Sequence, residues 1–173
     1  NRIYTMKIHR VILFIVDNTL ATPALIRPGD LGANIILHST SKYLDGHAVA
    51  LGGAIVDIDN FKFKDNPRYP EFNRPDESYH GLVYADLDCP FGLKIKAQMI
   101  RDIGSIMSPQ NAFLTNLGCE TLALRMERHS KNADIVAHYL EEQDKIEWVK
   151  YPTLKSSEFY GLAKKYLPDG CGG

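Results

Sequence analysis

The sequence predicts an α/β protein with a mostly parallel sheet. The first observation is an unbroken run of β-branched and aromatic residues from Val11 to Val16, typical of a strand covered on both faces in the interior of such a sheet. The second is a short crossover from Pro23 to Gly32, in which Pro28 limits the helix to a short turn. Another apolar strand follows from Asn34 to His38. Strand, crossover and strand in succession indicate an α/β fold.

The next two segments are a strand and a long insertion. Ala48 to Ile58, which contains the pair Gly52-Gly53, is expected to form a third strand with a close backbone approach. Residues 59–88 follow neither a strand period nor a helical period, and they carry three prolines and six aromatic residues. A loop of this length is uncommon inside a compact domain. Two interpretations are open: a surface insertion held down by its own aromatic side chains, or a segment that covers a site.

Helical spacing dominates the segment that follows. Gly92 to Ile103 has an apolar stripe. Ser108 as N-cap and Pro109 in the first helical position predict the start of another helix, which Gly118 is expected to end. Glu120 to Gln143 places apolar residues three and four positions apart and is the clearest helix of the chain.

The end of the chain is expected to open a second domain. Ile146 to Tyr151 alternates in polarity as a half-buried strand does, and Trp148 is expected to pack there. Ser156 to Leu167 returns to helical spacing. We therefore divide the chain into residues 1–118, a main domain that includes the 59–88 insertion, and residues 119–173, a bridging helix with the start of a C-terminal domain.

Composition excludes several classes of function. The 173 residues carry 20 Lys and Arg against 21 Asp and Glu, a net charge of -1, so no basic surface for nucleic acid is expected. No apolar run approaches the roughly 20 residues that a membrane-spanning helix needs. Three cysteines without metal-ligand spacing favour a reducing, cytoplasmic setting. The chain has no initiator Met and no capping element at its end, so we expect the central part of a longer protein.

Most other polar side chains fit ordinary roles. Arg125 and Arg128 stand on the clearest helix among acidic neighbours, which favours surface or interface ion pairs. The histidines show no helical ligand spacing within a wider carboxylate or cysteine cluster. We therefore expect no metal site.

Two charged residues stand out by position. Asp17 closes the first predicted strand, and Lys42 follows the second. Ligands of open α/β sheets bind outside the carboxyl ends of the strands, so both side chains are candidates for a ligand site. A structural ion pair remains an alternative. Ser39, Thr40 and Ser41 add three hydroxyls beside the lysine, which suit a phosphate as well as a helix N-cap.

These residues also carry a resemblance. Val16 to Pro23 (VDNTLATP) and Ser39 to His47 (STSKYLDGH) are similar to core motifs of the Cys/Met-metabolism family of pyridoxal-phosphate (PLP) enzymes. The likeness extends from about Val11 through most of the chain and is greatest to the O-acetylhomoserine sulfhydrylase branch, whose long aromatic segment the 59–88 insertion resembles. Further stretches that carry it are Pro75 to Tyr84, Arg101 to Gly104, Ser108 to Leu114, Glu120 to His129, Glu147 to Pro152 and Ala163 to Pro168.

The resemblance implies a fold and roles for single residues. The fold would be the fold type I arrangement of PLP-dependent transferases, incomplete here, with the start of an α+β C-terminal domain. Lys42 would hold PLP as a Schiff base and move protons at the substrate Cα and Cβ. Asp17 would face the pyridine nitrogen and keep it protonated. Ser39 and Ser41 would donate to the cofactor phosphate, and Thr19 could assist near the ring.

The implied reaction is γ-replacement on O-acetylhomoserine. Acetate would leave, and sulfide or a thiol such as methanethiol would add to give homocysteine or methionine. A cystathionine γ-synthase or γ-lyase of the same family is the nearest alternative. A catalytically inactive fragment is another, because the family's upstream glycine-containing phosphate loop, its ring-stacking aromatic residue and its downstream carboxylate-binding arginine are absent from the sequence. The family also implies a homodimer or homotetramer that acts on small molecules.

Overall fold

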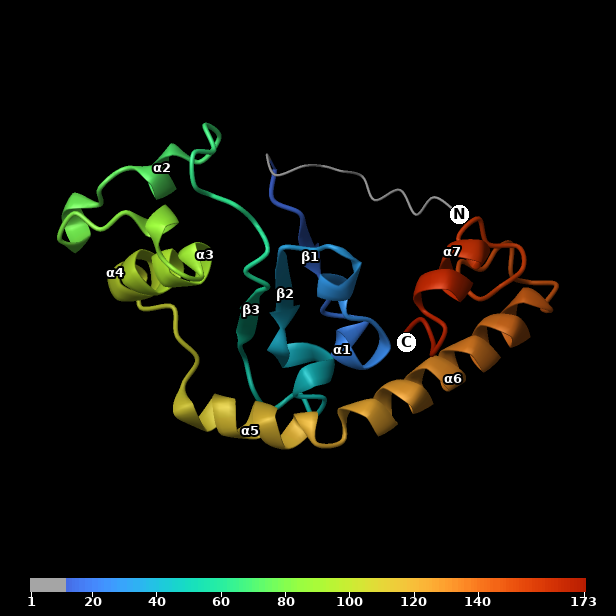
Figure 1. The fold of residues 1–173 in the computed structure, drawn as a ribbon. Helices are drawn as coiled ribbons and strands as arrows, with labels where there is room; N and C mark the ends of the chain where they lie inside the picture. The colour runs from blue at the N-terminus through green and yellow to red at the C-terminus, as the bar shows by residue number, and fades with distance from the viewer. Residues whose placement is uncertain (1–11) are drawn as a thin grey trace. The chain divides into compact units, whose positions relative to one another are not determined.

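The computed structural model describes residues 12–173 and contains a three-stranded sheet in the order β1-β2-β3 (Figure 1). β1 and β2 are parallel, with Ile15 opposite Ile35 and Asp17 opposite Leu37. The predicted α/β pattern is therefore present, including the short crossover. The strands are β1 (Ile15–Asp17), β2 (Ile35–Ser39) and β3 (Gly53–Asp57), and the crossover contains α1 (Thr22–Leu25) and the 3-10 turn η1 (Pro28–Leu31).

The first strand is shorter and more exposed than the sequence predicts. Val11 lies outside the described residues, and β1 begins only at Ile15. Phe14 is 50% exposed and Ile15 48% exposed, whereas Ile35 on β2 is 1% exposed. Among the described strands β1 is at the edge and β2 at the centre. The prediction that the first apolar run lies in the sheet interior is wrong for this part of the chain, because only β2 flanks β1.

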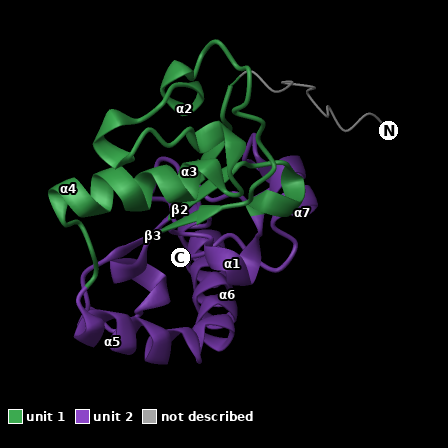
Figure 2. Cartoon of the chain, turned by 60° about the vertical axis from the view of Figure 1, so that its left-hand side comes forward, with its two compact units in different colours: residues 1–17, 28–37, 55–107 green, residues 18–27, 38–54, 108–173 purple. Residues whose placement is uncertain are grey.

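The chain divides into two compact units that are each discontinuous in sequence (Figure 2). Unit 1 takes in residues up to 17, 28–37 and 55–107, and unit 2 takes in residues 18–27, 38–54 and 108–173. The division predicted after residue 118, between a main and a C-terminal domain, stays a prediction.

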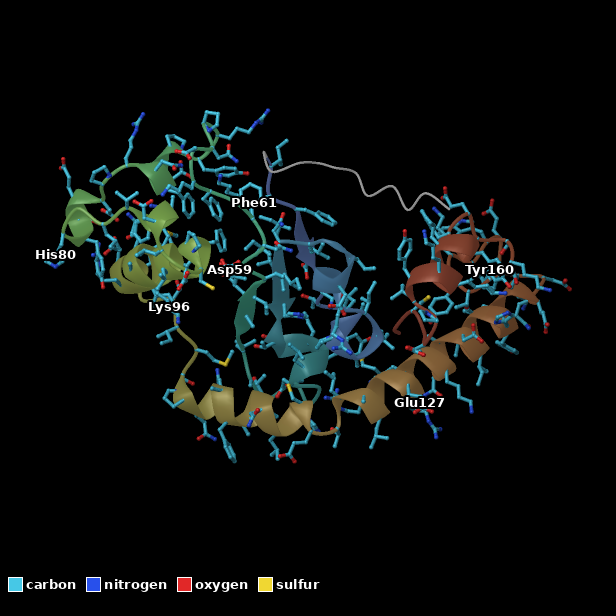
Figure 3. The ribbon with its side chains drawn as sticks, in the orientation of Figure 1. Asp59, Phe61, His80, Lys96, Glu127 and Tyr160 are labelled. Carbon is cyan, nitrogen blue, oxygen red and sulfur yellow. The ribbon has the colours of Figure 1, made fainter. Side chains whose placement is uncertain are left out.

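The 59–88 insertion of unit 1 has its own aromatic core. Phe63, Phe72 and Tyr84 are buried, and the Phe63 and Phe72 rings stack with centroids 4.0 Å apart. Phe61, labelled in Figure 3, and Tyr69 meet Phe63 edge to face. This packing supports an insertion held down by its own aromatic side chains. Its short helical segments are α2 (Pro70–Asn73), η3 (Glu77–Tyr79) and η4 (Tyr84–Asp86).

The predicted helix from Gly92 to Ile103 is confirmed as three consecutive helical segments. Gly104, at φ 72°, ends the run in the left-handed region that glycine adopts without a steric penalty. The segments are α3 (Pro90–Lys94), the π-helical η5 (Ile95–Ile100) and α4 (Arg101–Ile103).

Asp76 ties the insertion to this helix. Its carboxylate accepts hydrogen bonds from the Tyr84 hydroxyl at 2.7 Å, the Gln98 amide at 2.6 Å and the Ser78 hydroxyl at 2.7 Å. The hydrogen bonds from Ser78 and Tyr84 lower the pKa of Asp76 to about 2. Burial, together with the bond to Asp76, raises the pKa of Tyr84 to about 12. Both shifts stabilise the pair in its native charge state.

Unit 2 is mainly helical and confirms two predicted helices. α5 (Pro109–Cys119) begins as expected, because the Ser108 hydroxyl accepts from the Asn111 N–H at 3.2 Å. α6 (Leu122–Glu141) follows directly and buries Leu122 and Met126 against Leu25 of α1. In the described chain no helix combines the length and apolarity needed to cross a membrane.

The last segment departs from the expected strand. Ile146 to Tyr151 forms no strand, because none of the residues from 12 onward pairs with it, and a strand exists only with a hydrogen-bonded neighbour. Trp148 is 67% exposed, with the Lys150 ammonium 5.3 Å from its ring centroid, so its predicted packing is also wrong. The predicted helix from Ser156 is shortened to α7 (Tyr160–Tyr166).

Gly118 serves close packing instead of helix termination. α5 continues through it to Cys119. A Cβ at Gly118 would collide with the carbonyl oxygen of Asp45 and would lie 2.7 Å from that of Leu44.

We expect Gly118→Ala to destabilise the protein by about 1–3 kcal/mol, because the added methyl group forces the backbone of residues 44 and 45 away. Urea unfolding of the variant measures this loss. Gly161→Ala is the matched control, since a Cβ at that helical glycine meets nothing within 4 Å. An unfolding free energy of Gly118→Ala equal to that of the unmodified protein would contradict the packing argument.

Asp76 should make the aromatic insertion acid-sensitive. Because folding lowers its pKa from 3.8 to about 2, its stabilisation is complete above pH 3.8 and is lost as the pH falls through about 2. Near-UV circular dichroism across this range follows the loss. Asp76→Asn should already be destabilised at neutral pH and should lack this acid-dependent component, whereas Asp88→Asn, at an exposed carboxylate, should retain it. Identical acid profiles for Asp76→Asn and the unmodified protein would show that Asp76 is not the group responsible.

Candidate active site

The candidate lysine lies on a turn at the carboxyl end of the central strand. β2 ends at Ser39, and the chain continues into the π-helical turn η2 (Thr40–Leu44), which carries Lys42. The Ser39 N–H donates to the Thr19 hydroxyl at 2.8 Å, and the Thr40 N–H donates to the Gly52 carbonyl at 3.0 Å. These bonds fix the point where strand becomes turn, and all of these residues belong to unit 2.

Lys42 is exposed and has an unusual backbone. Its φ of -93° and ψ of -123° are not helical, although it stands within a helical turn. Its ammonium makes no hydrogen bond or ion pair with any residue that the structure describes. A lysine presented in this way is available to a ligand.

The three hydroxyls beside Lys42 differ in their engagement. The Ser41 oxygen accepts from the Gly52 N–H at 2.9 Å and lies 3.3 Å from the Gly52 carbonyl. The Thr40 hydroxyl is buried and unpartnered among the described residues, and the Ser39 hydroxyl also has no partner there. Ser41 can therefore keep its acceptor bond while its proton turns to an anion, and Ser39 has a free donor. This donor set fits a phosphate, and with Lys42 beside it the turn fits PLP.

Asp17 occupies the matching position on the neighbouring strand. It is the last residue of β1 and is exposed, and its register partner Leu37 lies near the end of β2. Because the strands are parallel, both end at the same edge of the sheet. The structure thus brings Ser39, Ser41, Lys42 and Thr19 together in unit 2, while Asp17 is the last residue of a segment of unit 1.

The turn is followed by a buried carboxylate that the sequence did not single out. Asp45 is fully buried and accepts from the N–H groups of His47 at 3.2 Å and Val49 at 3.1 Å. Burial would raise the pKa of Asp45, but these backbone donors outweigh it and hold the pKa below its ordinary value. Asp45 therefore stays ionised and fixes the chain that leaves the turn.

Arg125 is a second residue whose role sequence reasoning missed. Its guanidinium donates to the carbonyl oxygens of Tyr43 at 2.8 Å and Gly118 at 2.7 Å, and its Nε donates to the Thr121 hydroxyl at 3.1 Å. The ion pair expected for Arg125 is not what forms: its described partners are backbone and hydroxyl oxygens. No local pattern marks this role, because the carbonyls of Tyr43 and Leu44 lie about 80 residues away in sequence.

Comparison with known proteins identifies relatives along nearly the whole chain. The family model described as "Cys/Met metabolism PLP-dependent enzyme" matches residues 1–172. The homocysteine synthase of Schizosaccharomyces pombe is 45% identical over 161 residues, which cover 91% of this chain and 38% of that protein. The O-acetyl-L-homoserine sulfhydrylase of Leptospira meyeri is 44% identical over 90% of this chain and 37% of its own length.

Two solved structures of PLP-family enzymes are also similar to this chain. A putative O-acetylhomoserine (thiol)-lyase from Campylobacter jejuni, which carries an N'-pyridoxyl-lysine-5'-monophosphate, superposes with a TM-score of 0.88 at 44% identity, over 94% of this chain and 41% of that chain. The cystathionine gamma-lyase of Lactobacillus plantarum, complexed with L-serine, gives a TM-score of 0.70 at 32% identity, over 93% and 34%.

These matches confirm the fold class that the resemblance implies, the type I fold of PLP-dependent enzymes. The chain spans less than two fifths of the length of the curated relatives described above. The family match covers every residue of this chain except the last. With the lysine turn, the strand-end aspartate and this match together, the chain belongs to the Cys/Met metabolism PLP-dependent enzyme family.

Proposed function

We propose that this chain is the lysine-bearing part of a PLP-dependent O-acetylhomoserine sulfhydrylase. The observation that carries the proposal is the turn at the end of β2, where an exposed Lys42 stands beside the hydroxyls of Ser39 and Ser41. Identities of 45% and 44% to a homocysteine synthase and an O-acetyl-L-homoserine sulfhydrylase support this branch of the family.

The proposed roles rest on the resemblance to the family, and the positions of these residues at the strand ends support them. PLP, when bound, supplies a sink for the electrons that remain after a proton leaves the substrate Cα. Lys42 would hold the cofactor, and its Nζ would move protons at the substrate Cα and Cβ. Asp17 would keep the pyridine nitrogen protonated. Ser39 and Ser41 would donate to the phosphate, and the Thr19 hydroxyl, which accepts from the Ser39 N–H, would hold the backbone at Ser39.

The proposed reaction is replacement at the γ-carbon of O-acetylhomoserine. Acetate leaves, and sulfide or methanethiol adds to give homocysteine or methionine. The cystathionine γ-lyase reaction is the second candidate, because an enzyme of that name shares the fold at 32% identity. The higher TM-score and identity of the O-acetylhomoserine (thiol)-lyase favour the first. Product analysis with O-acetylhomoserine and with cystathionine separates the two.

The setting and assembly of the whole protein are also part of the proposal. Cys89, Cys119 and Cys171 are free, which suits the reducing cytoplasm. Exposed apolar side chains on α5 and α6, among them Phe113 and Leu124, suit burial in a homodimer or homotetramer.

Lys42→Ala is the direct test of the proposed function. The whole protein supplied with PLP should be yellow, and borohydride reduction should fix a pyridoxyl group on Lys42, detectable by peptide mass spectrometry. Lys42→Ala should lose the visible band, the fixed group and turnover of O-acetylhomoserine. Lys131→Ala, at an exposed lysine of α6, should retain all three. A whole protein that takes up no PLP would refute the proposal and support a catalytically inactive fragment.

Ser41 tests the phosphate role. Ser41→Ala leaves the Gly52 N–H without its acceptor, which costs about 1 kcal/mol of folding free energy, and it removes a phosphate donor, which should weaken PLP affinity about tenfold. Ser41→Thr keeps the oxygen and should restore most of both. Equilibrium dialysis of PLP and urea unfolding measure the two effects separately. Undiminished PLP affinity in Ser41→Ala would remove Ser41 from the phosphate site.

A further inference from the structure

We propose that Arg125 is a positioning residue for Lys42: its guanidinium holds the end of the turn that carries the lysine. That Arg125 holds the turn follows from the hydrogen bonds of unit 2. That this matters for catalysis rests on the proposed function. Arg125 stands in the first two turns of α6 and reaches back to the turn η2.

The guanidinium joins two backbone segments through three carbonyl groups. Nη1 donates to the carbonyl of Tyr43, the residue directly after Lys42, at 2.8 Å. Nη2 donates to the carbonyl of Gly118 in the last turn of α5 at 2.7 Å and lies 3.5 Å from that of Leu44. One planar group thus connects the end of the lysine turn to the junction between α5 and α6, which Figure 1 shows as successive helices.

The end of the turn needs these donors. The carbonyls of Thr40 and Lys42 are taken up by the N–H groups of Asp45 at 2.9 Å and Gly46 at 2.8 Å. No backbone N–H among residues 12–173 reaches those of Tyr43 and Leu44, as is usual for the last carbonyls of a helix, and the Cys119 thiol approaches the Leu44 carbonyl only to 3.8 Å. Arg125 satisfies them, and its positive charge stands at the carboxyl end of the turn, where the aligned peptide dipoles favour a cation.

Two glycines leave room for the guanidinium and for the contact between α5 and the end of the lysine turn. Gly46 has a φ of 70°, and a Cβ there would collide with the guanidinium. Gly118 lets α5 approach the carbonyls of Leu44 and Asp45. Nε is anchored separately by the Thr121 hydroxyl. The four hydrogen bonds of the side chain together hold the guanidinium in one orientation.

This arrangement bears directly on Lys42. Lys42 departs from the helical backbone, with φ -93° and ψ -123°, and the residues on both sides of it are held by hydrogen bonds. Ser41 is bonded to Gly52 before the lysine, and Arg125 is bonded to Tyr43 after it. A lysine at position 125 keeps the charge but lacks the planar fork, so it cannot serve the three carbonyls together.

The test compares Arg125→Lys with Arg128→Lys in the whole protein. Arg128 is an exposed arginine on the same helix and forms no hydrogen bond with the described residues, which makes it the matched control. In the cofactor-free protein, the amides of Asp45 and Gly46 should exchange with deuterium about tenfold faster in Arg125→Lys, since a lost charge-assisted bond weakens the turn by that order. Arg128→Lys should exchange like the unmodified protein.

The loaded protein gives the second readout. In Arg125→Lys the pH midpoint of the visible PLP band should shift, and kcat should fall about tenfold with little change in KM, because the lysine is misplaced while substrate binding is retained. If Arg125→Lys lowers only the melting temperature and leaves amide exchange and the pH midpoint unchanged, the positioning role is overturned. If no form of the protein takes up PLP, the proposed function fails, and amide exchange alone still decides whether Arg125 holds the turn.

Discussion

The turn that carries Lys42 cannot satisfy its own backbone, and much of unit 2 is arranged around that constraint. A five-residue helical turn leaves most of its N–H and carbonyl groups without internal partners. The Gly52 carbonyl serves the start of the turn, the Asp45 and Gly46 amides serve its middle, and Arg125 serves its end. Because Gly52 directly precedes β3 and Arg125 belongs to α6, the position of the lysine depends on tertiary structure as much as on its motif.

The aromatic insertion of unit 1 is stabilised by interactions of a different kind. Its stability comes from ring packing around Phe63 and from the carboxylate of Asp76, whose partners lie both in the insertion and on the following helix. A carboxylate with several hydrogen-bond donors gives an irregular segment one defined conformation. A buried hydroxyl such as that of Tyr84 would lower the free energy of unfolding if it lost its partner. The insertion is therefore an ordered element, although it contains little regular secondary structure.

Two segments that the sequence predicts as strands show that local composition alone does not decide whether a strand forms or is buried. The apolar run around Ile15 and the alternating segment around Trp148 both have the composition of strands, yet one is an exposed edge and the other is unpaired. Composition reports which faces a strand is suited to bury. Whether those faces are buried depends on neighbouring strands and helices, and the chain spans less than two fifths of the length of the two curated relatives.

Local sequence patterns were enough to predict the features that local chemistry controls. These are the strand, crossover and strand order, the N-cap at Ser108, the long helix α6, and the motif that places hydroxyls beside Lys42. Long-range contacts were needed to show that Gly118 serves close packing and that Arg125 bonds to backbone carbonyls in place of carboxylates. Both roles depend on carbonyl groups of residues 43–45, which are distant in sequence from Gly118 and Arg125 and which every residue type carries alike.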